Sequence, residues 1–196
     1  MRRKVMTKRM KLALAWIALF ISSTGFSGFL PGKIHPRLEG RGGGLIGSLV
    51  AVIPLYFLWE GGTWMMAAAI LGLIIIVGTP AVRLGEELMY KKWGARCRHT
   101  GESVSHDYNE TNLDEVAGMF VATLVVWPLH GWVASWVALL IVFVFFRASD
   151  TVKLWPIGWV EDVYKYSYPE LSVMLDDLVA GLMAGIVAGG FICLLG

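Results

Sequence analysis

The 196-residue chain has few cysteines, few charged residues and almost no net charge. Its two cysteines, Cys97 and Cys193, are too few and too widely spaced for a disulfide framework or a thiolate metal site, so we expect both to be reduced. The formal net charge of +2 gives no reason to expect a nucleic-acid partner. Charged residues make up 16% of the chain and hydrophobic residues 56%, which is typical of an integral membrane protein.

Five apolar blocks are long enough, or nearly long enough, to cross a bilayer. They occupy residues 45–59, 64–77, 116–129, 132–146 and 178–195. A helix rises about 1.5 Å per residue, so the shorter blocks need flanking residues to span a hydrocarbon core of about 30 Å. The sequence therefore predicts an all-α integral membrane protein with about five transmembrane helices, folded as a single membrane-embedded domain over residues 1–196.

A basic segment followed by an apolar run opens the chain. Six Lys and Arg residues fall within the first eleven positions, directly before the apolar residues 12–21. A secretory signal peptide has the same outline, but no small-x-small cleavage site follows here. We therefore expect residues 1–44 to form a basic N-terminal region with a retained interfacial or re-entrant helix.

The orientation follows from the short connections and the basic residues. Residues 60–63 and 130–131 make tight turns, which place both hairpins on the same side of the membrane. All 17 Lys and Arg residues then lie on the other side, in the N-terminal region and in the loops 80–113 and 147–172. The positive-inside rule makes that side cytoplasmic and predicts a cytoplasmic N-terminus.

Adjacent acids precede two of the apolar blocks, at positions 114–115 and 176–177. An ionised carboxylate in hydrocarbon costs about 2.5–3.5 kcal/mol, and two neighbours repel each other unless a cation joins them. Helix capping explains one acid per helix but not two. The predicted topology brings six acids to the cytoplasmic face: Asp107, Asp114, Glu115, Asp150, Asp176 and Asp177. Such a cluster indicates a site for Mg²⁺ or Mn²⁺.

Two basic residues accompany the acids after the fourth block. Arg147, Asp150 and Lys153 recur every three residues and share one face if the helix continues. The basic side chains could hold a phosphate oxygen, or they could simply anchor the helix at the interface. Two other classes stay open, a cation- or proton-coupled transporter and a structural protein with capped helices. The third, fourth and fifth blocks carry no acid deeper than their cytoplasmic ends, which argues against a conduit.

Three motifs in a fixed order make the sequence more specific. The first is His106-Asp107 followed by Leu113-Asp114-Glu115-Val116-Ala117-Gly118-Met119. The second runs from Phe146 to Trp159 and contains Lys153-Leu154-Trp155-Pro156-Ile157. The third is Leu175-Asp176-Asp177-Leu178-Val179-Ala180-Gly181. Together they resemble the phosphatidylglycerophosphatase A family of bacterial membrane enzymes, and a weaker match includes Gly47-Ser48.

The resemblance implies a Mg²⁺-dependent phosphatase of the bacterial inner membrane, acting on a phospholipid, phosphatidylglycerophosphate, at the cytoplasmic face. Its implied catalytic set is Asp107, Asp114, Glu115, Asp150, Lys153, Asp176 and Asp177, and its metal ligands are Asp107, Asp114, Glu115, Asp150 and Asp177. Substrate binding is assigned to Arg147, Lys153, Ser48 and Arg41, with an interfacial anchor as the alternative for Arg41. Neighbours on a helix point about 100° apart, so we expect one acid of each pair to bind metal and the other to cap, orient or transfer protons.

Overall fold

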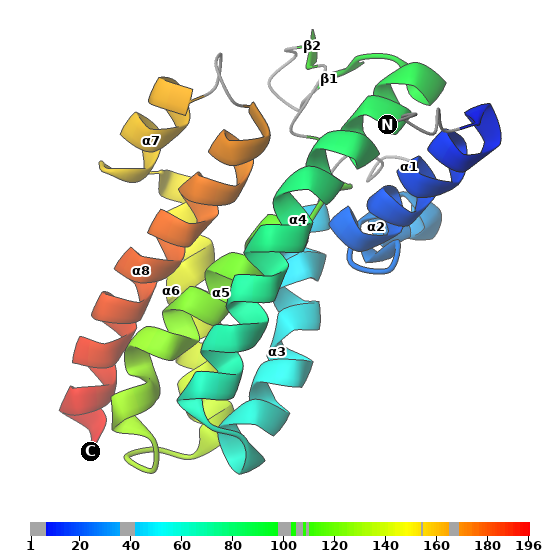
Figure 1. The fold of residues 1–196 in the computed structure, drawn as a ribbon. Coiled ribbons are helices and arrows are strands. Elements are labelled where there is room, and N and C mark those ends of the chain that lie inside the picture. Colours follow the sequence, from blue (N-terminus) through cyan, green and yellow to red (C-terminus); the bar gives the residue numbers. More distant parts are fainter. Residues whose placement is uncertain are drawn as a thin grey trace, which may run out of the picture.

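The computed structural model describes residues 7–35, 42–97, 103–104, 108, 110–153, 155–164 and 169–196. These residues form a bundle of helices (Figure 1), and their regular structure is helical except for one short ladder. The ladder pairs β1 (Arg96–Cys97) with β2 (Ser103–Val104) in antiparallel register. The expected all-α fold is confirmed.

Five helices correspond to the five apolar blocks. They are α3 (Gly43–Gly61), α4 (Trp64–Trp93), α5 (Leu113–Val126), α6 (Ser135–Val152) and α8 (Pro169–Leu195). Within the described residues, α3, α4, α6 and α8 are each long and apolar enough to cross a bilayer. The 14-residue α5 continues into a short 3-10 helix, η3 (Trp127–Leu129). The chain is thus a multi-pass membrane protein, as the sequence predicts.

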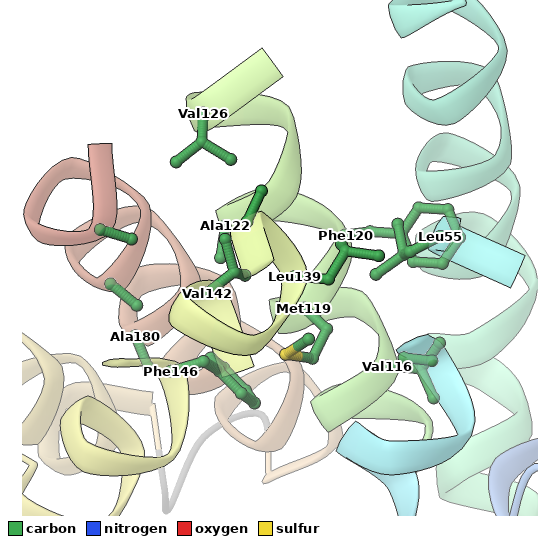
Figure 2. Close-up of a cluster of buried hydrophobic side chains, with 14 of the residues drawn as sticks. Leu55, Val116, Met119, Phe120, Ala122, Val126, Leu139, Val142, Phe146 and Ala180 are labelled. Atoms are coloured by element: carbon green, nitrogen blue, oxygen red, sulfur yellow. The ribbon is translucent and has the colours of Figure 1, made fainter. Parts of the chain in front are cut away.

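The short helix α5 lies at the centre of the bundle. It contacts α3, α4, α6 and α8, and ten of its 14 residues are buried. Figure 2 shows Phe120 and Met119 of α5 among Leu55 of α3 and Leu139 of α6. Because protein rather than lipid surrounds α5, the bilayer thickness places little constraint on its length.

The two hairpin turns meet at one end of the bundle. The Nε2 atom of His130, after η3, lies 2.8 Å from the carbonyl oxygen of Trp59 at the end of α3. The rings of Trp59 and Trp127 pack with their centroids 5.1 Å apart. The prediction that both turns lie on the same side is therefore confirmed, and the C-terminus lies at that end too (Figure 1).

The N-terminal region packs beside the opposite end. It consists of α1 (Lys8–Ser22), η1 (Ser27–Phe29) and α2 (Leu30–Ile34), with a bend of 74° after α1. Such a bend is the geometry of a broken span or a re-entrant segment. The contact of α1 is with the C-terminal part of α4, where the ammonium of Lys92 lies 4.5 Å from the ring centroid of Trp16. The expected N-terminal helix is present.

Much of the sequence assigned to the loops 80–113 and 147–172 is helical instead. Helix α4 continues to Trp93, α6 continues to Val152, and α7 (Ile157–Tyr164) packs against α8. The reason for the extension of α4 is burial against α1. Leu88 and Met89 of α4 join Leu19 of α1 in a small hydrophobic cluster, so the helix gains tertiary contacts beyond its apolar block.

Candidate functional site

Three carboxylates from two helices converge at the end of the bundle opposite the hairpin turns. Asp114 and Glu115 lie in the first turn of α5, and Asp177 lies in α8. One oxygen from each side chain lies within 4.8 Å of the other two. Asp114 and Asp177 are only 6% and 5% exposed, so the cluster is held inside the protein.

Glycines allow α5 and α8 to approach closely enough for this convergence. Gly118 follows Asp114 by four residues and Gly181 follows Asp177 by four, so each glycine lies one turn beyond its acid on the same face. A side chain at position 181 would overlap the backbone of Gly118. Small residues at four-residue spacing are how membrane helices pack closely. The spacing Gly181-x-x-x-Gly185 is the sequence signal for this contact.

The carboxylate of Glu115 fits against the backbone of α3. A side chain at Gly44 would collide with the Oε1 atom of Glu115, so glycine leaves the space that this carboxylate occupies. Asn112, just before α5, ties the same segment in place by donating from Nδ2 to Ser27 Oγ at 3.0 Å and to the Gly43 carbonyl at 3.3 Å. Asn112 and Gly44 were not among the residues predicted for the site.

Arg147 contacts two other predicted site residues, Asp150 on α6 and Ser48 on α3. Its Nη1 atom lies 3.0 Å from Oδ2 of Asp150, in a pair that is three-quarters or more buried. The same nitrogen donates to Oγ of Ser48 at 3.3 Å, and Ser48 in turn donates to the Gly44 carbonyl at 2.9 Å. The guanidinium is therefore fixed beside the segment that receives Glu115.

Lys153 and Asp176 form a second ion pair next to the cluster. The ammonium of Lys153 lies 2.8 Å from Oδ2 of Asp176, and Oδ1 of Asp176 accepts the backbone N–H of Asp177 at 3.0 Å. The two acid pairs are thus arranged differently. Asp114 and Glu115 both belong to the three-carboxylate group, whereas on α8 only Asp177 does.

The remaining predicted residues lie outside this group. Asp150 acts electrostatically on both Glu115 and Asp177, but its partner within ion-pair distance is Arg147. Asp107 and Arg41 lie outside the described residues. The structure therefore brings together three of the five acids predicted to bind metal and places a fourth beside them.

The donor set fits a hard divalent cation. Oδ1 of Asp114 and Oε2 of Glu115 are buried and have no hydrogen-bond partner among the residues that the structure describes. Within the described residues, Asp114, Glu115 and Asp177 make no ion pair with a basic side chain. Two ionised carboxylates less than 4.8 Å apart repel each other by on the order of 3 kcal/mol at an effective dielectric constant of about 20. Oxygen ligands of this kind suit Mg²⁺.

Fold and site together define a multi-pass helical membrane protein with a buried acidic centre flanked by Arg and Lys. A family model described as phosphatidylglycerophosphatase A matches residues 20–192. The phosphatidylglycerophosphatase A of Escherichia coli K12 is 29% identical over 188 residues, which cover 94% of this chain and 88% of that protein.

The corresponding protein of Haemophilus influenzae is 28% identical over 130 residues, covering 64% of this chain and 75% of that protein. No solved structure matches the chain. The chain belongs to the phosphatidylglycerophosphatase A family. The resemblance seen in the motifs is confirmed, and with it the expectation of a phosphatase.

Proposed function

We propose that the chain hydrolyses the terminal phosphomonoester of phosphatidylglycerophosphate to phosphatidylglycerol and phosphate, at the cytoplasmic face of a bacterial inner membrane and with Mg²⁺ as cofactor. The observation that supports this most is the convergence of three carboxylates within 4.8 Å beside an immobilised arginine. The names of the relatives supply the substrate. The positive-inside pattern of the sequence supports the cytoplasmic face.

Asp114, Glu115 and Asp177 are the residues that would hold the metal ion. A bound Mg²⁺ supplies Lewis-acid stabilisation of the phosphate charge. Oδ1 of Asp114 and Oε2 of Glu115 have no hydrogen-bond partner among the described residues, and a bound cation would offset the cost of burying these carboxylates in ionised form. Asp107 is a further ligand in this proposal, on the strength of its motif alone.

Arg147 and Lys153 would bind the phosphate oxygens in this mechanism. Ser48 and Asp150 hold the guanidinium of Arg147 from two sides, so it is oriented before the substrate arrives. Asp176 holds the ammonium of Lys153 in the same way. Fixed cationic groups stabilise the charge on a transferring phosphoryl group.

The proposed reaction is an in-line displacement at phosphorus. A bond forms between phosphorus and the attacking oxygen, the bond to the glycerol oxygen breaks, and that oxygen takes up a proton as phosphatidylglycerol leaves. A carboxylate of the cluster either accepts a proton from an attacking water or attacks phosphorus itself, in which case water hydrolyses the acyl phosphate in a second step. The lipid tails stay in the bilayer throughout.

The transporter alternative receives no support from the arrangement of the acids. A proton or cation pathway needs ionisable groups along the membrane normal. In the described parts of α5, α6 and α8, every acid lies at the end that carries the site. The acids form one compact group rather than a series across the membrane, and a compact group is what a hydrolytic site requires.

The test is phosphate release from phosphatidylglycerophosphate in mixed micelles, with and without Mg²⁺. We expect Asp114→Asn and Asp177→Asn to lower the rate by about 100-fold or more, because loss of metal-site groups has effects of this size or larger. Asp107→Asn and Asp150→Asn extend the series. Glu87→Gln is the control, since Glu87 is an exposed acid on α4 paired with Arg83 and Lys91.

A second readout does not depend on activity. Mg²⁺ at about 100 times its dissociation constant should stabilise the wild type by about 2.7 kcal/mol, and Asp114→Asn should reduce this shift in thermal unfolding. A folded wild type that releases no phosphate with Mg²⁺ would refute the enzyme proposal. Full activity in the acid variants would instead refute the role of these carboxylates in the metal site.

A further inference from the structure

An apolar groove runs between α3 and α6. It encloses about 480 Å³, within the range of about 300–1,000 Å³ typical of small-molecule sites. Its walls come from the stretch between Leu49 and Phe57 on α3 and the stretch between Trp136 and Phe143 on α6, and every lining side chain is aliphatic or aromatic. Most membrane helix pairs pack closely through small residues instead.

One end of this groove lies at the polar site. Leu49 directly follows Ser48, and Phe143 lies one helical turn before Arg147. Ser48 and Arg147 are joined by a hydrogen bond of 3.3 Å. From there the groove extends along α3 by about 12 Å, at about 1.5 Å per residue, away from the carboxylates. The groove therefore begins within one helical turn of the residues proposed to bind phosphate.

The side chains of the groove form a floor and two raised edges. Leu139 is 1% exposed and lies at the floor, whereas Ile53 and Trp136 are 62% and 65% exposed and stand at the edges. An apolar groove with an arginine one helical turn beyond its end matches an amphipathic molecule with an anionic head and a hydrocarbon tail. A peptide or a polar solute would leave its polar groups unsatisfied in the apolar part.

We infer that the groove between α3 and α6 binds one acyl chain of the phospholipid substrate while its phosphate lies at Arg147 and the carboxylates. This inference rests on the proposed function, and it assigns to the enzyme a chain-recognition subsite. The acyl chain lies against protein on one side and lipid on the other, so the substrate need not leave the bilayer to be cleaved.

The experiment compares substrates that differ only in chain length. Rates of phosphate release are measured for dioleoyl and dihexanoyl phosphatidylglycerophosphate in the same mixed micelles, and the ratio of their kcat/KM values is the readout. Val52→Trp adds an indole to the groove, whose wall includes Val52. Ile76→Trp is the control, because Ile76 on α4 is 75% exposed and is not part of the groove.

We expect Val52→Trp to lower the dioleoyl-to-dihexanoyl ratio about tenfold, since shaped apolar pockets discriminate by roughly this factor. Ile76→Trp should leave the ratio at the wild-type value. An unchanged ratio in Val52→Trp, or an equal loss with both substrates, overturns the inference and leaves the proposed function intact. A wild type that cleaves neither substrate overturns both.

Leu140→Trp is the substitute variant if Val52→Trp does not fold. It fills the groove from its edge, where the native Leu140 side chain is 54% exposed.

A substrate analogue with a diazirine in the middle of one acyl chain gives an independent readout. Its cross-links should map to residues 49–57 and 136–143 and should disappear with excess unlabelled substrate. Cross-links spread over all lipid-facing helices, or unaffected by competition, would overturn the inference.

Discussion

Adding a single methyl group at Gly118 should displace the backbone of Asp177 and so disturb the acidic site. Gly118 lies where α5 meets α8, and a Cβ at this position would lie 2.7 Å from the carbonyl oxygen of Asp177. Cβ atoms essentially never approach other atoms more closely than 3.0 Å. The backbone at Asp177 would therefore have to retreat by roughly half an ångström, because packed interiors cannot absorb such an overlap.

The cost of Gly118→Ala can be worked out from this overlap. Inserting a methyl group into a well-packed interface costs about 1–3 kcal/mol, and the added Cβ would overlap the ring of Phe146 even more closely than the carbonyl oxygen of Asp177. A misplacement of about 1 Å can cost about 100-fold in rate, so half that shift corresponds to about tenfold. We expect Gly118→Ala to lose both stability and activity by these amounts.

The assay is phosphate release at saturating Mg²⁺, with thermal unfolding in detergent measured on the same samples. Gly190→Ala is the matched control on α8, because nothing lies within 4 Å of a Cβ there. Alanine should be neutral or stabilise that helix by about 0.5–1 kcal/mol. If Gly118→Ala were as active and as stable as Gly190→Ala, close approach of α5 and α8 could not be what positions Asp177.

Two further substitutions test the surroundings of the site. Lys153→Met should destabilise the protein by about 1–2 kcal/mol, because it removes the ammonium that lies 2.8 Å from Asp176. Chemical unfolding of the double variant Lys153→Met/Asp176→Asn should show that part of this loss is recovered. Strictly additive effects of the two substitutions would show that the pair does not interact. Glu86→Ala should cost about 1–3 kcal/mol, because the buried Glu86 accepts the backbone N–H of Tyr108 at 3.1 Å. Glu87→Ala should change stability by less than about 0.5 kcal/mol, and equal effects of the two would contradict the role of Glu86.

The sequence predicts those parts of the fold that depend on apolar length and on connection length. The five blocks became helices and the two hairpin turns meet at His130 and Trp59, because a bilayer admits few other arrangements of such blocks. It also predicts that acids distant in the sequence lie together. Once both turns are on one side, the starts of α5 and α8 and the end of α6 must share the other.

The other features of the fold and site depend on contacts between helices that no short stretch of sequence reveals. The helical extension of α4 to Trp93 is stabilised by α1, so its own apolar block, which ends at residue 77, does not reveal it. Likewise, nothing near Gly44 in the sequence indicates that the carboxylate of Glu115 occupies the space that a side chain at position 44 would fill. Such complementarity between segments about 70 residues apart appears only when the helices are packed.

The different arrangement of the two acid pairs follows from helix geometry. Asp114 and Asp177 precede their contact glycines by four residues, so both lie on the faces where α5 and α8 touch. The other acid of each pair lies about 100° away round its helix, because Glu115 follows Asp114 and Asp176 precedes Asp177. On α5 that direction leads Glu115 to the vacant space at Gly44 and keeps it in the carboxylate group. On α8 it leads Asp176 to Lys153, where its two oxygens accept from the ammonium and from the N–H of Asp177. Because the neighbouring helix is α3 in one case and the end of α6 in the other, α5 supplies two acids to the three-carboxylate group and α8 supplies one.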